Sequence, residues 1–294
     1  MKWFQKNILK FVKKTIKNKR DKLVNETKIN LSRSNLSGRN FVKRDFTEAN
    51  LSGADLTNAK LAKASFIWAD LNGAILQRAS GDRALFHFAS LLWADLSNAS
   101  LIEADFSCAK ASQIDLSGTN CQLAKFMGAA LDGGNLVKGN FQAVDLFNAN
   151  LTDANCSHAN LSETNLANTE LQRTNLTNVS LIEAQLINAN MTAADLQGAV
   201  VIYAELELVS LIDANLTDCD LSHSSLFGAN LEGAILSGAK LLNTDLRQAN
   251  LENTLLQNVD FTQCRVAGAV FTNARGLTAI QKIWLKNNGA LNIY

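Results

Sequence analysis

Large apolar side chains recur at every fifth position along most of this chain. Between Leu31 and Phe271 the register is unbroken and contains 49 such positions, called centres below, of which Leu or Phe fills 42. The residue two before the centre is mostly small, with Ala at 29 of these positions, and the residue just before the centre is often Asn or Asp. The stretch ANLSGADLTNAKL, from Ala49 to Leu61, shows the rule. Seven centres depart from Leu or Phe: Gly81, Ala111, Cys121, Cys156, Met191, Val201 and Val266.

A period of five matches neither the 3.6 residues of a helical turn nor the two-residue alternation of a strand. On an amphipathic helix the centres would move around the circumference and define no apolar face. The chain is therefore predicted to turn a corner in every repeat and to return above itself. The small residue and the centre would point inward, and the other three positions would face solvent.

A second periodicity indicates how many repeats make one coil. Phenylalanine occupies five centres that are 20 residues apart, which are Phe46, Phe66, Phe86, Phe106 and Phe126. Such spacing predicts an aromatic ladder inside a solenoid and a coil of four repeats with a square cross-section. At about 4.8 Å between stacked strands, about 12 coils would form a rod of roughly 60 Å.

With this pattern the sequence resembles the pentapeptide-repeat family, whose motif is Ala-(Asp/Asn)-Leu-X-X, over residues 29–275. The resemblance implies an all-β solenoid, a right-handed quadrilateral β-helix, here of about 12 coils with short N- and C-terminal α-helical caps. It does not imply one function, because a fold supports many sites. The best-understood members bind DNA gyrase and protect it from quinolones as acidic, DNA-shaped rods. Other members are regulatory or unassigned.

The first of three predicted parts, residues 1–28, is strongly basic. It carries ten Lys and Arg residues against two acidic residues, a net charge of +8. On a helical projection Phe4, Ile8, Leu9, Phe11, Val12 and Ile16 share one arc, and lysines occupy the other, which predicts a basic amphipathic helix. Its candidate membrane-binding residues are Lys2, Lys6, Lys10, Phe11, Lys13, Lys14 and Lys17.

Three roles are open for this basic segment. Its apolar arc could cap the first coil, because a solenoid needs covered ends. It could lie on a membrane surface, giving peripheral membrane contact. It could also be a nucleic-acid-binding arm or a targeting segment. A secretory signal is not expected, because lysines interrupt every apolar stretch.

The third predicted part, residues 276–294, follows the end of the repeat near Ala274. Thr278 and Gln281 have the spacing of a capping box, and Gly289 is typical of a helix end. The predicted apolar side of this helix consists of Leu277, Ile280, Ile283 and Trp284. It is expected to cover the last coil or to form a homodimer contact. The resemblance supports the second role, because a C-terminal helix pairs two rods end to end in the gyrase-binding relatives.

Composition and charge sharpen this interpretation. The 294 residues include no Pro, as expected where a proline would remove a hydrogen bond from a ladder. The net charge of +1 combines the +8 segment with a remainder of −7. Residues 139–239 contain twelve acidic residues and one basic residue, Arg173. Such a belt could mimic DNA or keep rods from associating. The second role is favoured because the acids fall on all four faces, and direct nucleic-acid binding by the rod is not expected.

No enzyme is expected, because no catalytic or cofactor-binding motif occurs. The three histidines, His87, His158 and His223, fall at outward positions without a partner arrangement for a triad, and no P-loop, H-E-x-x-H or G-x-G-x-x-G is present. Four cysteines fall at inward positions and only Cys108 at an outward one, so disulfides, a zinc site and other cofactors are not expected. A reducing cytoplasm fits this usage. There is also no apolar run of about 18 residues that would predict a transmembrane helix.

Outward aromatic residues are the informative exceptions to the polar surface. The candidate partner-binding patch consists of Ile67, Trp68, Leu85, His87, Phe88, Leu92 and Trp93. Buried Trp is typical of interaction hot spots, so we predict a protein-docking patch centred on Trp68, Phe88 and Trp93. An apolar corner without a partner, or one covered by the N-terminal helix, is the alternative. Nearby, Gly81 replaces a large centre and is expected to bend or widen the coil.

The sequence therefore predicts a rigid, non-enzymatic scaffold or regulator that binds an unidentified protein. A DNA-mimic rod that binds gyrase is the first alternative, and a scaffold attached to a membrane surface by its N-terminal helix is the second. The gyrase-binding relatives carry loops that interrupt the coils and contact the enzyme. This sequence has no insertion between Leu31 and Phe271, which disfavours the gyrase alternative because function is commonly carried by loops.

Overall fold

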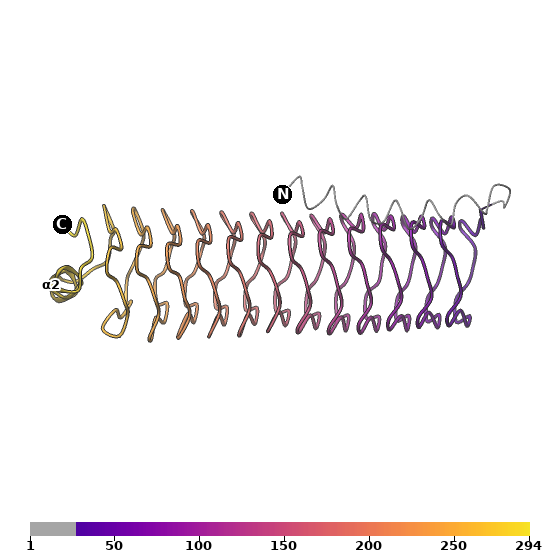
Figure 1. Cartoon of the computed structure of the whole chain (residues 1–294), viewed down its shortest axis with the longest axis horizontal. Coiled ribbons are helices and arrows are strands. Elements are labelled where there is room, and N and C mark those ends of the chain that lie inside the picture. The colour runs from indigo at the N-terminus through magenta and orange to yellow at the C-terminus, as the bar shows by residue number, and fades with distance from the viewer. Residues whose placement is uncertain (1–27) are drawn as a thin grey trace, which may run out of the picture.

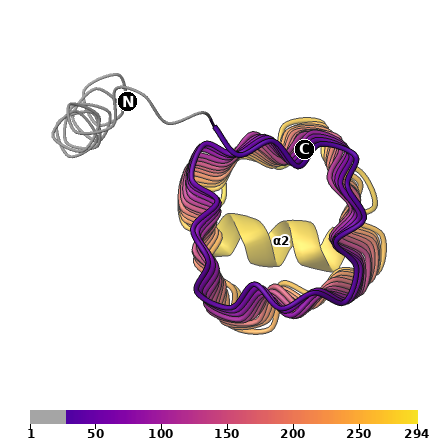
Figure 2. The ribbon, with the colours of Figure 1, turned by 90° about the vertical axis from the view of Figure 1, so that its right-hand side faces the viewer.

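The described part of the chain is a rod of stacked, four-sided coils. The computed structural model describes residues 28–294, so the predicted N-terminal helix lies outside it except for Lys28. Seen from the side the coils are parallel (Figure 1), and seen along the rod they superimpose as a square (Figure 2). The sheets consist of isolated single-residue β-bridges, and the one helix among the described residues is α2, Ala279–Asn287.

Successive coils are joined by parallel main-chain hydrogen bonds. The bridges pair residues 20 positions apart, as in Asn50 with Asp70, so one coil contains four repeats. In most repeats the centre and the second residue after it both donate to the next coil. Leu51 N–H donates to the carbonyl of Asp70 at 2.7 Å, and Gly53 N–H donates to the carbonyl of Asn72 at 2.8 Å. The predicted 20-residue coil is confirmed.

Each corner is a tight turn closed on the centre itself. The N–H of Ala54 donates to the carbonyl of Leu51 at 3.0 Å, and the N–H of Ser52 donates to Oδ1 of Asn50 at 3.0 Å. Where Asn or Asp precedes a centre, as Asn50 does, its side chain thus accepts from an N–H that no other coil reaches. Every N–H of the repeat 50–54 therefore donates to a main-chain or side-chain acceptor. A proline, which has no N–H, would leave one of these acceptors without its hydrogen bond.

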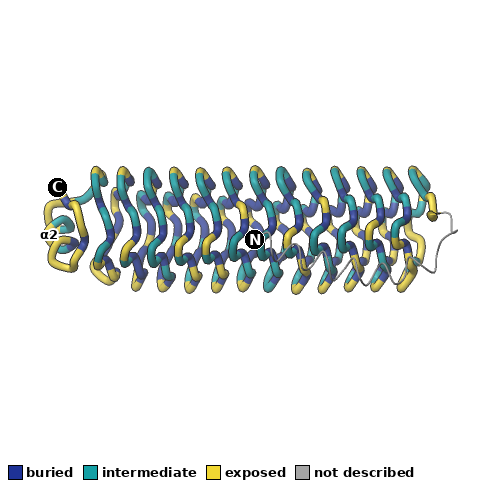
Figure 3. Tube along the Cα trace, turned by 45° about the horizontal axis from the view of Figure 1, so that its top comes forward, coloured by how far each residue is buried: buried dark blue, intermediate teal, exposed yellow. Residues whose placement is uncertain are grey.

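The interior is filled by one large and one small side chain per repeat. The centres and the residues two before them are almost all buried from Phe46 to Phe271, and Figure 3 shows the buried positions recurring at the same place in each coil. The predicted aromatic ladder is confirmed. Its successive ring centroids, Phe46–Phe66, Phe66–Phe86, Phe86–Phe106 and Phe106–Phe126, lie 5.3, 4.9, 4.5 and 4.7 Å apart.

The coil is not widened at Gly81, contrary to the prediction from its missing side chain. Gly81 N–H still donates to the carbonyl of Ser100 at 2.7 Å, and Ala84 N–H closes the turn on Gly81 at 2.9 Å. A Cβ at Gly81 would lie 3.0 Å from Cδ2 of Leu101. The leucine of the next coil therefore occupies the space that a large centre would need, and the ladder keeps its register.

The regular stacking is interrupted once near the C-terminal end. Lys240 and Asp260 are not bridged, although the pairs of residues on either side of them are. Gln263 is also the one residue at the second position after a centre, among the described residues, that lacks a positive φ.

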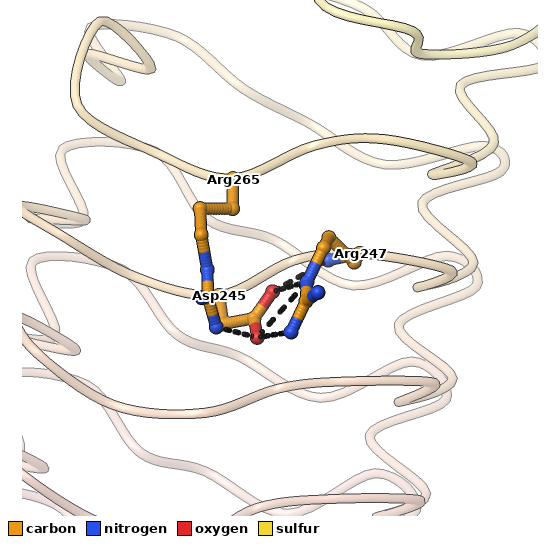
Figure 4. Close-up of polar contacts among 3 residues, drawn as sticks. All are labelled: Asp245, Arg247 and Arg265. Carbon is orange, nitrogen blue, oxygen red and sulfur yellow. Dashed lines mark hydrogen bonds and ion pairs between the residues drawn. The ribbon is translucent and has the colours of Figure 1, made fainter.

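An ion cluster next to this interruption joins the last two coils (Figure 4). The carboxylate of Asp245 accepts from Nη2 of Arg247 at 2.8 Å and from Nη2 of Arg265 in the coil above.

Helix α2 crosses the opening of the square at the end of the rod (Figure 2). The predicted capping box is confirmed, with N–H of Gln281 donating to Oγ1 of Thr278 at 3.3 Å and the N–H of Thr278 donating to Oε1 of Gln281 at 2.8 Å. Leu285, which the sequence analysis did not select, is the fully buried residue of the helix.

The predicted apolar side of α2 is only half right. Leu277 and Trp284 pack against the core. Ile280 and Ile283 do not, because they are 80% and 61% exposed. The helix is rotated so that Leu285 faces the last coil, and the two isoleucines consequently face solvent. A role for them in a homodimer stays a prediction.

Candidate partner-binding surface

The aromatic residues selected from the sequence lie at the tips of the turns. Trp68, Phe88 and Trp93 are each the second residue after a centre, here called the turn-tip position, and have φ values of 61°, 57° and 57°. Asn and Gly, which tolerate this left-handed conformation, are the commonest residues there. A bulky residue in this conformation costs roughly 1–2 kcal/mol. These three side chains are therefore placed outward at a conformational cost.

Two of these rings stack on each other outside the rod. The centroids of Trp68 and Phe88 lie 4.4 Å apart with planes 9° from parallel. The coils hold them together, because Trp68 N–H donates to the carbonyl of His87 at 3.0 Å. Trp68 is nevertheless 42% exposed, and Trp93, at the next corner, is 67% exposed. The result is a flat aromatic surface with a second indole beside it.

The remaining members of the patch surround these rings. Leu85 is exposed, whereas Ile67 and Leu92 are half-buried. The structure thus brings the seven predicted residues onto two adjacent faces in successive coils. They are called the aromatic patch below and comprise Ile67, Trp68, Leu85, His87, Phe88, Leu92 and Trp93.

A polar contact fixes one edge of the aromatic patch. Nε2 of His87 lies 3.0 Å from Oδ2 of Asp105 in the next coil. Burial alone would raise the pKa of Asp105, but hydrogen bonds from His87 and Ser107 outweigh it and hold that pKa below its usual value. Asp105 is therefore ionised at neutral pH and orients the imidazole beside Phe88.

The sequence analysis missed a second stacked pair on the surface. The rings of Tyr203 and His223 lie 4.8 Å apart, and Leu208 nearby is also exposed. Tyr203 and Leu208 occupy turn-tip positions with positive φ, as does the exposed Leu123. The rule that found Trp68, an apolar residue two after a centre, would have found these three as well.

The cysteines of the rod are held as thiols. Burial raises the pKa of both Cys121 and Cys156 to about 12. Cys108 is half-buried at a turn tip, and its pKa is also raised, by burial and by the nearby Asp105. Within residues 28–294 no group of three or more His, Cys, Asp or Glu side chains could hold a metal ion. No helix in that range is long and apolar enough to cross a membrane.

The chain belongs to the pentapeptide-repeat family. The family model, described as pentapeptide repeats, matches eight times within residues 29–253. The matched segments are 29–66, 64–101, 104–142, 124–155, 140–178, 154–192, 189–226 and 214–253. The right-handed β-helix solenoid is accordingly the fold class of this chain. No protein in a search of curated sequences matches it significantly.

Solved structures similar to this chain include other proteins of the family. HetL, from the cyanobacterium Nostoc sp. strain PCC 7120 and involved in heterocyst differentiation regulation, is 31% identical over 79% of this chain and 91% of its own, with a TM-score of 0.29. A trypsin-treated variant of QnrB1, a plasmid-mediated fluoroquinolone resistance protein, is 19% identical over 72% and 91%, with a TM-score of 0.41. Rfr23 from the cyanobacterium Cyanothece 51142 is 30% identical over 34% and 62%, with a TM-score of 0.18.

Proposed function

We propose that this chain is a non-enzymatic, rigid rod that binds a partner protein through the aromatic patch. One observation carries the proposal, namely the stacking of Trp68 on Phe88 at 4.4 Å while Trp68 stays 42% exposed. Aromatic side chains that are held rigid before binding lose little conformational entropy when a partner covers them. They also supply the large apolar contact that dominates binding hot spots.

The surroundings of the patch suit a protein partner. Trp93 adds a second exposed indole, and the polar contact of His87 with Asp105 adds a polar rim. A hydrophobic centre with a polar edge is the usual anatomy of a protein interface. The double substitution Trp68→Ala/Phe88→Ala tests the proposal. It should abolish capture of a partner without changing the fold, because neither ring belongs to the interior ladder.

A second candidate function rests on the acidic belt. Residues 139–239 carry twelve carboxylates, and their one basic residue, Arg173, is paired with Asp153 at 2.7 Å. A rod with this charge could occupy the DNA-binding surface of a topoisomerase. Gyrase supercoiling with and without the purified protein tests this. Inhibition, or protection from a quinolone, would favour this function, whereas unchanged supercoiling would leave the aromatic patch as the functional surface.

A further inference from the structure

Charged residues are segregated along one of the four corners of the rod. The turn-tip residues form four columns, in which successive members lie 20 residues apart. The column that begins at Lys43, called the Lys43 column, starts with basic residues and continues with acidic ones. Its six charged members are Lys43, Lys63, Arg83, Glu103, Glu163 and Glu183. The other three columns contain four, three and one charged residues within residues 31–273.

Two lysines and two glutamates of this column lack an oppositely charged partner. Lys43, Lys63, Glu163 and Glu183 are exposed, and none of them forms an ion pair within residues 28–294. Glu163 accepts a hydrogen bond from Nε2 of Gln142 at 2.8 Å. The arginine and the remaining glutamate of the column pair with each other at 2.7 Å. The two lysines and the two unpaired glutamates can therefore meet opposite charges on another molecule.

Apolar and small side chains accompany these charges. Leu123 of the same column is 55% exposed, and Val42, beside its first lysine, is 39% exposed. Ile102 and Ile182, each one residue before a glutamate of the column, are half-buried. The adjacent flat side of the rod is small and uncharged at the residue just before each centre, with Ser80, Ser100, Asn120, Asn140, Asn160 and Ser180 there. Another rod could approach this side closely.

We propose that two copies of this chain associate side by side and antiparallel along the Lys43 column. A two-fold axis perpendicular to the rods would pass midway between Lys43 and Glu183, so that the same surface of both copies forms the contact. Each Lys43 then faces Glu183 of the second copy, and each Lys63 faces Glu163. The contact extends over seven coil steps, about 34 Å.

The apolar residues occupy the centre and the ends of this contact. The axis passes between the levels of Ile102 and Leu123, which brings these residues of the two copies together. Val42 of each copy lies beside Ile182 of the other. An apolar centre with charged pairs around it is the usual anatomy of a protein interface. Exposed ion pairs contribute little affinity, but opposed like charges are costly, so the charges determine register and orientation.

Other alignments of the two columns are less favourable. Sliding one copy by one coil in one direction brings Glu103 of both copies together. Sliding it by one coil in the other direction places Lys43 opposite Tyr203 and leaves this lysine without an acidic partner. A parallel arrangement would place the acidic belt, residues 139–239, against the same belt of the second copy, and the two would repel. The belt thus keeps parallel rods apart and favours the antiparallel pair.

The aromatic patch stays uncovered in this dimer. Trp68 and Trp93 belong to two other turn-tip columns. Each dimer would therefore present two aromatic patches, and a partner with two binding sites would be held more tightly than by one rod. Only this consequence rests on the proposed function, because the association of two copies can be measured in the isolated full-length chain.

Charge reversal tests the pairing of Lys63 with Glu163. In the homodimers of Lys63→Glu and of Glu163→Lys, like charges would face each other twice, so the dissociation constant of each variant should rise about tenfold. An equimolar mixture of the two variants should form a heterodimer with the affinity of the wild type, because opposite charges face each other again. Lys110→Glu, on the opposite side of the square, is the matched control and should dimerise like the wild type. Sedimentation equilibrium of the full-length chains measures each sample.

A second pair of variants tests the apolar centre. Leu123→Asp should raise the dissociation constant about tenfold, because it places a carboxylate in the contact close to Glu103 of the second copy. Leu208→Asp is the matched control, since Leu208 is a turn-tip residue of another column and is 58% exposed. The control should leave the dissociation constant unchanged.

The outcomes separate this contact from other contacts and from the proposed function. A wild type that is monomeric at every concentration, or a mixture that does not regain affinity, would overturn the proposal. A dimer that persists in Leu123→Asp but is lost in Ile280→Asp/Ile283→Asp would also overturn it, and would show an end-to-end contact through α2. Failure to dimerise together with retained partner capture would remove this contact alone. Charge-dependent dimers together with unchanged capture by Trp68→Ala/Phe88→Ala would remove the proposed function alone.

Discussion

The indole of Trp68 stacks on the ring of Phe88 outside the rod at 4.4 Å, two residues along the chain from the interior stack of Phe66 on Phe86 at 4.9 Å. The same 20-residue period produces both contacts. The interior pair is fully buried and contributes to stability, whereas the exterior pair leaves aromatic surface in contact with solvent. We therefore expect substitutions in the two ladders to have opposite consequences for stability and for binding.

Replacement of Trp93 by asparagine should stabilise the protein and weaken partner binding. Trp93 is 67% exposed and has a φ of 57°, and asparagine adopts this conformation more readily. The expected gain is about 0.5–1 kcal/mol in the free energy of unfolding, measured by urea denaturation. A loss of stability would show that the indole makes a stabilising contact and is not held at a conformational cost.

Truncation within the interior ladder should be strongly destabilising. Phe106 is fully buried between Phe86 and Phe126, at 4.5 and 4.7 Å. Phe106→Ala should lower the free energy of unfolding by about 3–5 kcal/mol. Phe106→Leu is the matched control and should lower it by less than about 1.5 kcal/mol, because Leu is the usual centre. Equal losses for the two variants in denaturant titrations would contradict the ladder's proposed role.

Removal of the charge of Asp245 should destabilise the end of the rod in a pH-dependent way. Burial raises the pKa of Asp245, but hydrogen bonds from Arg247 and Arg265 outweigh it, and the pKa lies below its usual value. The charged form therefore stabilises the fold above the unfolded-state pKa, about 3.9. This contribution is lost as the pH falls through the lower, folded-state pKa.

The expected result is a decrease of about 1–3 kcal/mol in the free energy of unfolding for Asp245→Asn at pH 7. The difference from the wild type should disappear as the pH falls through the lowered folded-state pKa of Asp245. Thermal unfolding across this pH range measures it. Asp153→Asn is the control, because the pair of Asp153 with Arg173 is solvent-exposed on both sides. It should change the free energy of unfolding far less than Asp245→Asn does, because solvent screens an exposed ion pair. A pH-independent loss at Asp245 would show that shape rather than charge is responsible.

Much of the fold could be predicted from the sequence, because every five-residue repeat places its inward residues by the same pattern. The period placed the centres, the phenylalanine spacing gave the coil length, and Thr278 with Gln281 gave the capping box. The rotation of α2 could not be predicted in the same way. It depends on how Leu285 fits the last coil, and helical periodicity alone does not select between Leu285 and Ile280. The unbroken coil at Gly81 likewise depends on a neighbour, Leu101, that is 20 residues away.

The sequence predicts which residues form the aromatic patch, but it does not predict their backbone conformation or the stacking of their rings. Its residues are outward exceptions in a polar pattern, which the sequence reveals. The positive φ at Trp68 and Trp93 follows from the turn type, which a five-residue period does not specify. Tyr203 and His223 stack in the same way, because both occupy turn-tip positions and lie 20 residues apart.

Quantitative affinity capture with matched variants tests the aromatic patch most directly. The wild type, Trp68→Ala/Phe88→Ala and the control Tyr203→Ala/His223→Ala, which removes the other exposed stacked pair, would be compared by mass spectrometry and far-UV circular dichroism. The predicted result is a protein captured by the wild type and the control but lost from the Trp68/Phe88 variant, with all three spectra the same. Identical captured proteins for the three chains would contradict the patch as a binding surface.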